Sequence, residues 1–268
     1  MDGSSVPARQ GAPDPSRDEL LRLWQDLSDE SRRALLRTAR ILAHSEGIIS
    51  DEQAGGTGQP GAEISGVFSL GSHCYTSYIL KELGYRTEAG PFDWIFSDPQ
   101  MVADCLEDQF AAFLNPSFYT YTGNPDGIGR GHLHFSPKYQ RPVIFNHHDP
   151  QKPDDYAYFQ RAVARFEDAL SSGRRYLFVA ILDPGRGKPE KVERLHDALT
   201  RRSPAAELLV MVRSAGAVGV PTATWQRSRQ GLHVYQVKTT SSHVRGLSHE
   251  NPADDDLIKD VIRRHATA

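Results

Sequence analysis

The sequence contains only two cysteines, Cys74 and Cys105, among its 268 residues, too few for a disulfide framework. It also lacks any run of about 18 apolar residues, the length at which a membrane-spanning helix is expected. The first residues, Met-Asp-Gly-Ser-Ser-Val-Pro, have neither the basic nor the apolar region of a secretory signal peptide. These absences predict a cytoplasmic protein that keeps both thiols reduced and binds no membrane.

No sign of charge dominates the chain, since 31 Lys and Arg residues stand against 34 Asp and Glu residues, a net charge of −3. The two signs are interspersed rather than gathered in a basic stripe, which argues against a nucleic-acid partner. No glycine-rich loop matches a dinucleotide-binding or Walker pattern, so we expect no cofactor. The predicted partner is a small-molecule or peptide substrate whose identity the sequence does not indicate.

Composition divides the chain into four parts. Residues 1–17 are rich in Gly, Pro, Ser and Asp and are predicted to be disordered. Residues 18–50 carry two helical apolar periods and predict a helical hairpin appendage, which must dock on the main domain or on a partner because short helices cannot bury their apolar faces alone. Residues 51–62 form a Gly-rich linker, and residues 63–268 form the main domain.

Strand-like and helix-like segments alternate through the main domain. The expected strands cover residues 64–70, 142–145, 176–182, 208–212 and 234–237. The expected helices cover about 74–83, 154–170, 188–202 and a closing segment around 257–262. This alternation predicts an α/β fold with three layers, in which a mostly parallel sheet of about five strands has helices on both faces.

Polar side chains follow each of the five expected strands. In open α/β sheets, ligands bind beyond the carboxyl ends of the strands. The groups expected there are Ser72, His73 and Cys74; Asn146, His147, His148 and Asp149; Asp183; Arg213 and Ser214; and Ser241, Ser242 and His243. If the sheet is parallel, these groups converge into one site.

Cys74 is the candidate nucleophile of this site. The Gly71-Ser72 turn leads from a strand into a helix, so the sulfur is expected near the helix N-terminus, where the dipole lowers a thiol pKa. The alternative is that Cys74 is a small buried hydrophobe, as free cysteines often are. Cys105 lies in a helical apolar pattern and is predicted to be a core residue.

His147 and His148 are the candidate bases, since a reactive thiol needs an imidazole within hydrogen-bonding reach. A metal site is an alternative, with further ligands from His132, His134 or His243. No metal-binding spacing such as HExxH or CxxC is present, however, so no metal is expected.

The segment Gly90-Pro-Phe-Asp-Trp-Ile95 places one carboxylate among large apolar residues. A buried carboxylate is costly unless it is paired, so Asp93 is expected to meet a cation, backbone N–H groups or a histidine. It is either a structural cap or strut, or a group that takes part in catalysis.

Three motifs together resemble a family of bacterial domains of unknown function described as putative papain-like cysteine peptidases. The motifs are Ser69-Leu-Gly-Ser-His-Cys74, Pro91-Phe-Asp-Trp94 and the segment from Phe145 to Asp149. The resemblance covers about residues 65–265. It implies that Cys74 is a thiol nucleophile and that His148, directly before Asp149, is its base, although His147 is an additional histidine at this place.

The first hypothesis is therefore a cysteine-dependent hydrolase or acyl transferase, with Asp93 or Asp183 orienting the imidazole. Substrate-binding roles are expected for Ser72, His73, Trp94, Arg213 and His243. Two alternatives stay open: a transferase acting on a sugar or other polar metabolite with a structural Cys74, and a non-catalytic interaction protein.

Overall fold

A computed structural model describes residues 15–27, 63–122 and 129–267 of the chain. The chain divides into two compact units, Met1–Pro60 and Gly61–Ala268. In the first unit, α1 (Pro15–Asp26) lies where the first helix of the appendage was expected. The second expected helix, the linker at 51–62 and residues 1–14 lie outside the described residues, so the predicted domain boundaries stay predictions.

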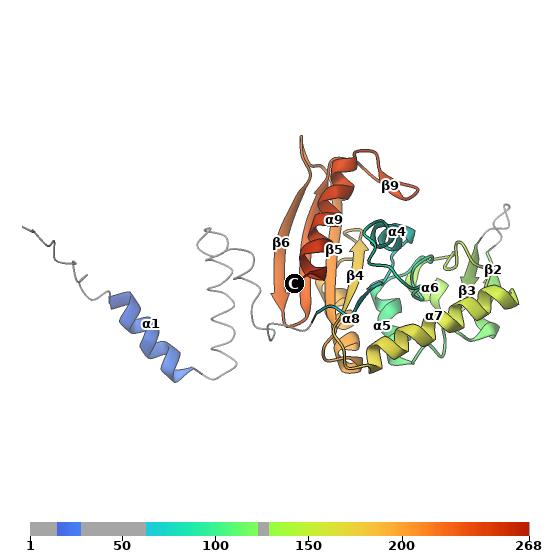
Figure 1. The fold of residues 1–268 in the computed structure, drawn as a ribbon, viewed down its shortest axis with the longest axis horizontal. Helices are drawn as coiled ribbons and strands as arrows, with labels where there is room; N and C mark the ends of the chain where they lie inside the picture. The colour runs from blue at the N-terminus through green and yellow to red at the C-terminus, as the bar shows by residue number, and fades with distance from the viewer. Residues whose placement is uncertain (1–14, 28–62, 123–128, 268) are drawn as a thin grey trace, which may run out of the picture. The chain divides into compact units, whose positions relative to one another are not determined.

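A five-stranded sheet forms the centre of the second unit (Figure 1). Its strands, in spatial order, are β1 (Gly66–Ser69), β4 (Tyr176–Leu182), β5 (Glu207–Ala215), β7 (Leu232–Thr239) and β6 (Thr222–Arg229). The first four are parallel to one another, and only β6 is antiparallel to its neighbour. The predicted mostly parallel sheet is therefore confirmed.

Strand β4 explains why the sheet has helices on both faces, because all seven of its residues are buried. Phe178 and Leu182 belong to one hydrophobic cluster, whereas Val179 and Ile181 belong to another. Side chains alternate across a strand, so these two clusters lie on opposite faces. The sequence of a strand that is buried on both faces is a continuous apolar run, as it is in β4.

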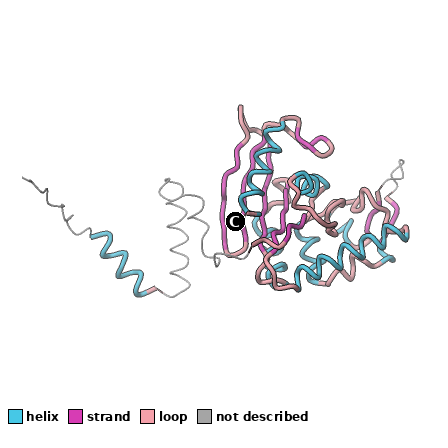
Figure 2. Tube along the Cα trace, viewed as in Figure 1, coloured by secondary structure: helices cyan, strands magenta, loops and turns pink. Residues whose placement is uncertain are grey.

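Helices from different parts of the chain complete the two outer layers (Figure 2). The first cluster contains side chains of α5 (Pro99–Glu107), α7 (Pro153–Ser171) and α8 (Pro189–Arg202). The second contains side chains of α4 (Cys74–Glu82) and α9 (Pro252–Ala266). This arrangement confirms the three-layer architecture.

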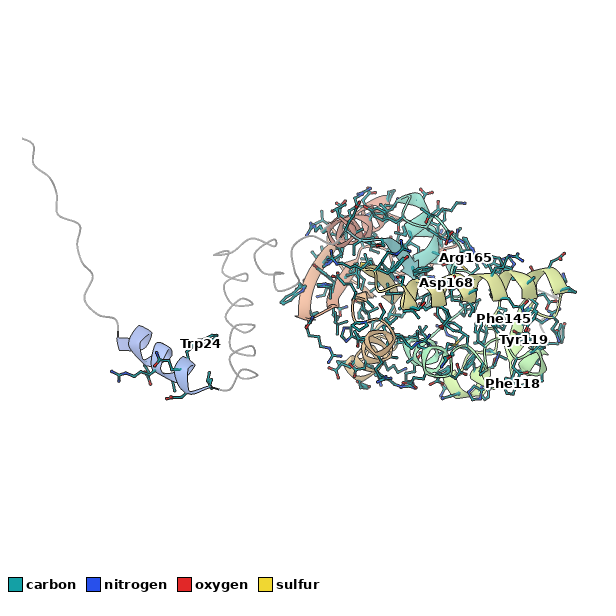
Figure 3. All side chains as sticks on the ribbon, turned by 60° about the horizontal axis from the view of Figure 1, so that its bottom comes forward. Trp24, Phe118, Tyr119, Phe145, Arg165 and Asp168 are labelled. Atoms are coloured by element: carbon teal, nitrogen blue, oxygen red, sulfur yellow. The ribbon has the colours of Figure 1, made fainter. Side chains whose placement is uncertain are left out.

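The expected strand at 142–145 is not part of the central sheet. Phe145 instead forms isolated bridges with Ile95 and Arg130, and it packs on Tyr119 at 5.4 Å between ring centroids (Figure 3). Pro142 cannot donate to a ladder, and the apolar Ile144 and Phe145 are buried in an irregular region. That region holds the short elements η1 (Pro116–Phe118), β2 (Tyr119–Tyr121), β3 (Arg130–His132) and α6 (Phe135–Tyr139).

Strand β6 was not anticipated, because its sequence, TATWQRSR, is largely polar. It pairs on one side only, at the edge of the sheet, where a strand needs little apolar surface. A small hairpin of β8 (Val244–Arg245) and β9 (Ser248–His249) follows β7 and precedes α9. Among the helices in the described ranges, none is both long and apolar enough to cross a membrane.

Replacing Phe178 by alanine should destabilise the sheet strongly. The ring is fully buried and packs against Phe68 and Phe166, with centroids 5.9 and 5.4 Å away. Loss of such a ring costs about 3–5 kcal/mol of unfolding free energy. Urea denaturation measures it, with Val218→Ala, at a 96% exposed position, as the control that changes little. A loss below about 1 kcal/mol for Phe178→Ala would contradict the assigned core.

Candidate active site

The turn between β1 and α4 sets the position of Cys74. Gly71 and Ser72 both adopt left-handed backbone conformations, with φ of 80° and 72°. Ser97 holds this turn from outside: its Oγ donates to Leu70 O at 2.8 Å and accepts from Ser72 N at 2.9 Å. Two consecutive left-handed residues redirect the chain sharply, so α4 begins at Cys74 just beyond the carboxyl end of β1.

His147 is the histidine that contacts the thiol. Its Nε2 lies 3.0 Å from Cys74 Sγ, within hydrogen-bonding distance. The side-chain amide of Asn146 lies beside the same pair, with Nδ2 3.3 Å from His147 Nε2. The structure thus brings together a thiol, an imidazole and an amide from two segments far apart in sequence.

The electrostatics of this pair differ from the expectation drawn from the helix dipole. Burial raises the pKa of Cys74 above its usual value, and hydrogen bonds from its own backbone N–H and from Asn146 offset only part of that rise. Burial and the neighbouring His148 lower the pKa of His147. The expected lowering of the Cys74 pKa is therefore wrong: at neutral pH the pair is a neutral thiol hydrogen-bonded to a neutral imidazole.

His148 has a different role from the one that the resemblance implied. Its Nδ1 hydrogen-bonds Asp155 Oδ1 at 2.9 Å, and its ring stacks on Tyr158 with centroids 4.3 Å apart. Asp155 also accepts from the backbone N–H of Asp149 at 2.9 Å. His147 therefore lies against Cys74, whereas His148 lies against the first turn of α7. His148 thus holds the loop against α7, and His147 is the histidine that lies against the thiol.

Asp93 supports the wall of the site. Its carboxylate accepts from Arg86 Nε at 2.6 Å and from Gly90 N at 2.8 Å, as expected for a buried carboxylate. The Arg86 guanidinium lies over the Trp94 ring at 5.4 Å, and Trp94 packs edge-on against His147 with centroids 5.6 Å apart. Asp93 thus positions Trp94 against the imidazole through Arg86.

Asp183 follows β4 as expected, but it pairs with Arg213 at 2.9 Å rather than with a histidine. Among the described residues, no carboxylate forms an ion pair with the His147 ring within 4.0 Å, so neither Asp93 nor Asp183 orients it directly. The two aspartates expected as alternatives for a third catalytic group therefore hold arginines instead.

His73 caps the helix that carries the thiol. Its Nδ1 accepts from Tyr75 N at 3.2 Å, which places the ring proton on Nε2. Burial lowers the pKa of His73 to about 4, although the charge of Asp183 acts in the opposite direction. The imidazole therefore stays neutral at physiological pH and keeps its capping hydrogen bond.

The described contacts of Ser72, His243 and His132 do not include Cys74 or His147. Ser72 is buried, and its Oγ has no hydrogen-bond partner among the described residues. His243 is exposed, and His132 is buried against Ala112 O at 3.1 Å. Within the described ranges, no three His, Cys, Asp or Glu side chains group as ligands of a metal ion. Cys105 is fully buried in the core, as predicted.

Sequence reasoning missed a buried cluster under α4. Tyr75 Oη donates to Asp255 Oδ1 at 2.7 Å, and Asp255 also pairs with His249 Nδ1 at 2.6 Å. These contacts fasten the β8–β9 hairpin and α9 to the helix of Cys74. No local pattern indicated them, because the three residues come from distant segments. Asn146 was expected at this edge of the sheet, but the sequence assigned it no role.

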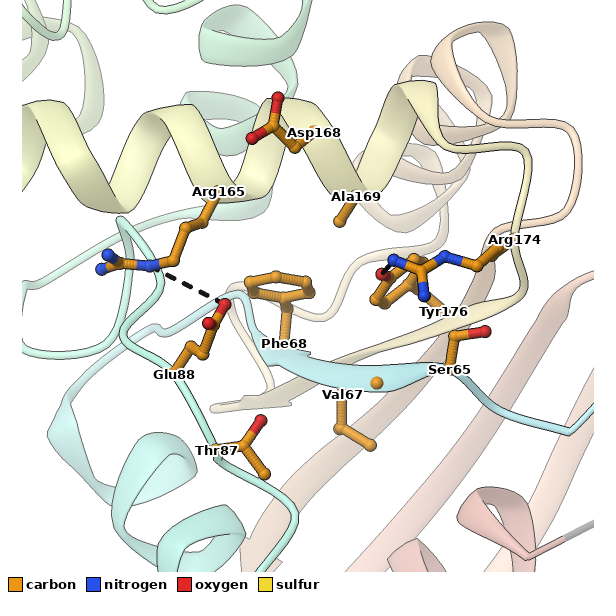
Figure 4. A pocket seen from close by; sticks show the side chains of 11 residues that line it. Ser65, Val67, Phe68, Thr87, Glu88, Arg165, Asp168, Ala169, Arg174 and Tyr176 are labelled. Carbon is orange, nitrogen blue, oxygen red and sulfur yellow. Dashed lines mark hydrogen bonds and ion pairs between the residues drawn. The ribbon is translucent and has the colours of Figure 1, made fainter.

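A depression of roughly 410 Å³ lies elsewhere, around the amino end of β1 (Figure 4). Arg165 and Glu88 form an ion pair at 4.0 Å across it, and Tyr176 and Arg174 line its other side. Cys74 lies beyond the opposite end of the same strand, so this depression is separate from the candidate active site.

Comparison with known proteins adds a family to this geometry. Residues 65–213, more than half of the chain, match the family described as "Putative papain-like cysteine peptidase (DUF1796)". The chain belongs to this family. The matched residues include the Cys74 turn, the Trp94 wall, the His147 loop and Arg213. No curated protein and no solved structure matches the chain significantly.

Replacing Gly71 by alanine should disrupt the turn that carries Cys74. A Cβ there would lie 2.4 Å from Ser97 Oγ and 3.0 Å from Phe92 O, in addition to the left-handed strain. Strain and overpacking together should cost more than about 2 kcal/mol of stability. Gly84→Ala is the matched control, since Gly84 is also left-handed but has no atom within 4 Å of the added Cβ. Equal thermal shifts for the two variants would contradict the role of Ser97.

Proposed function

We propose that this protein is a cysteine-dependent hydrolase or acyl transferase in which Cys74 is the nucleophile and His147 is the general base. The observation that carries the proposal is the 3.0 Å contact between Cys74 Sγ and His147 Nε2. A nucleophile and a base within hydrogen-bonding reach are the minimum arrangement for covalent catalysis. Membership of a family described as papain-like cysteine peptidases supports the same chemistry.

The first half of the reaction begins from the neutral pair. As Cys74 Sγ attacks a carbonyl carbon, its proton passes to His147 Nε2, so a thiolate is never exposed in the resting protein. The tetrahedral intermediate collapses when the imidazolium donates that proton to the leaving amine or alkoxide. The product of this half is a thioester on Cys74 and a neutral imidazole.

The second half returns the protein to its starting state. His147 Nε2 takes a proton from water, or from an acceptor amine or alcohol, as that oxygen or nitrogen attacks the thioester. Collapse expels the Cys74 sulfur, which recovers the proton from the imidazolium. Water gives hydrolysis and another acceptor gives acyl transfer, with the same residues in the same roles.

Charge on the carbonyl oxygen needs donors next to the sulfur. The side-chain amide of Asn146 hydrogen-bonds Cys74, and its Nδ2 lies 3.3 Å from His147 Nε2. Cys74 is also the first residue of α4, so backbone N–H groups of the helix N-terminus lie close to the sulfur. Helix N-termini and side-chain amides both stabilise oxyanions. Asn146 is therefore proposed as an oxyanion donor, a role that no acidic residue of the site could fill.

Variants of the pair should lose thiol-dependent turnover together. With p-nitrophenyl acetate as a simple acyl donor, Cys74→Ser and His147→Gln should each reduce turnover by about 10²–10⁴-fold. The double variant should be little worse than either single one, because the two side chains act as a unit. His134→Gln, at an exposed position, is the control for loss of a histidine. Full activity in His147→Gln with loss in His148→Gln would reverse the assignment of the base.

The pH dependence of Cys74 alkylation should show a neutral resting thiol. Burial raises its pKa above the usual 9.0, so labelling by iodoacetamide should climb through the alkaline range and level off only above pH 9. Turnover needs a neutral His147, whose lowered pKa puts the acid limb below pH 6.5. Mass spectrometry of the native protein should find Cys105 unlabelled, since it is fully buried. A labelling rate already constant from pH 6 to pH 9 would indicate a preformed thiolate and contradict the neutral pair.

A further inference from the structure

Three arginines from separate segments converge on the turn that carries Cys74. Arg213 lies near the end of β5 and pairs with Asp183 at 2.9 Å. Arg186 follows β4 and pairs with Asp98 at 2.7 Å, next to Ser97. Arg141 precedes the His147 loop, and its Nη2 donates to the carbonyl oxygen of Ser97 at 3.3 Å. Ser97 is the residue that holds the Gly71–Ser72 turn, so Arg141 and Arg186 lie beside the segment that fixes this turn.

Positive charge exceeds negative charge in this cluster. Lys191 also approaches Asp98, at 3.5 Å, so the cations Arg141, Arg186, Arg213 and Lys191 are matched by only the carboxylates of Asp98 and Asp183. Asp98 is 3% exposed and already has two cationic partners. The carboxylates therefore leave part of the cationic charge uncompensated.

Arg141 is the least satisfied member of the cluster. Among the described residues its Nε is buried without a hydrogen-bond partner, its Nη2 donates to the neutral carbonyl of Ser97, and its guanidinium lies over the Phe96 ring at 5.6 Å. Burial and the charge of Arg186 lower its pKa to about 10, so the guanidinium remains charged at neutral pH. A charged guanidinium that is half-buried and has a donor without a partner is costly unless a ligand completes it.

The cluster lies on the His73 side of the thiol. Among the causes that lower the pKa of His73 are the charges of Arg213 and Arg141, which places both guanidinium groups near the residue adjoining Cys74. Arg141 contacts Ser97, and Ser97 Oγ accepts from the backbone N–H of Ser72, two residues before Cys74, so the cluster meets the turn. A group bound by the cluster would lie beside the turn that leads into Cys74.

We propose that Arg141, together with Arg186 and Arg213, binds an anionic group of the substrate, so that the protein acts on acyl compounds carrying a carboxylate or phosphate a few bonds from the scissile carbonyl. Guanidinium groups match both anions through paired N–H donors. The inference rests on the proposed role of Cys74 and specifies the substrate class of that site.

Two thiol reagents that differ only in charge test the proposal. The labelling rate of Cys74 is measured with 3-maleimidopropionate and with its uncharged amide, each normalised to the rate with N-acetylcysteinamide. At low salt the anionic reagent should be favoured by roughly tenfold, and the preference should fall as salt screens the cluster. Arg141→Gln should remove most of the preference, whereas Arg141→Lys should keep part of it. Arg263→Gln, at an exposed position in α9, is the matched control for loss of one positive charge.

The two sources of the anion are distinguished by protection, which also keeps the test valid if Arg141→Gln does not fold. Inorganic phosphate that slows labelling by the neutral reagent at a lower concentration than acetate would identify a phosphate site, and the reverse would identify a carboxylate site. Equal normalised rates of the two reagents at low salt, without protection by either anion, would overturn the inference while leaving Cys74 reactive. Failure of both reagents to label Cys74 at any pH would instead overturn the proposed function, and the inference with it.

Discussion

The two hydrogen bonds between the Ser97 hydroxyl and the Gly71–Ser72 turn are the constraint on which the site depends. One hydroxyl donates to the last carbonyl before the turn and accepts the amide of Ser72 within it. The left-handed backbone of Ser72 is strained by about 1–2 kcal/mol, because the residue carries a side chain. Because the turn has this conformation, α4 starts at Cys74. The carbonyl oxygen of the same Ser97 accepts a hydrogen bond from Arg141. Ser97 thus contacts both the turn that positions the thiol and the arginine Arg141 of the cluster.

The neutral state of the thiol–imidazole pair follows from how deeply the sulfur is placed. Cys74 is 8% exposed, and desolvation penalises a thiolate more than the local donors favour it. A helix N-terminus lowers a thiol pKa effectively only where the charge is not also removed from water. In the proposed reaction this arrangement favours proton transfer during attack, and it keeps the resting sulfur less reactive toward oxidants than a free thiolate would be.

Much of the fold could be predicted from the sequence, because a strand that is buried on both faces has a continuous run of apolar residues. The run from Tyr176 to Leu182 predicted a central strand, and α7 and α8 begin at the prolines that open their apolar periods. The segment around Phe145 could not be predicted in this way. Its apolar residues are buried in an irregular region, and short apolar runs are the same in a strand and in a packed loop.

The candidate site was predictable in its members more than in their roles. The rule that ligands bind beyond the carboxyl ends of parallel strands brought out Cys74, Asp183 and Arg213. The choice between His147 and His148 depends on which way one loop faces, and that is decided by Asp155 on α7, far from any strand end. The role of Asp93 depends on Arg86 and Trp94 in the same manner. Residue types report which chemistry is possible, whereas the partners that fix each role come from segments that only the folded chain brings together.

The carboxylates around the site are paired with arginines rather than with the imidazole. Asp93, Asp183 and Asp98 each hold an arginine in place, and none of these carboxylates forms an ion pair with His147. Carboxylates that are committed to arginines do not raise the basicity of the imidazole, which is consistent with the lowered pKa of His147. The positive surplus therefore stays on the guanidinium groups beside the turn, while the thiol and the imidazole are both uncharged at neutral pH.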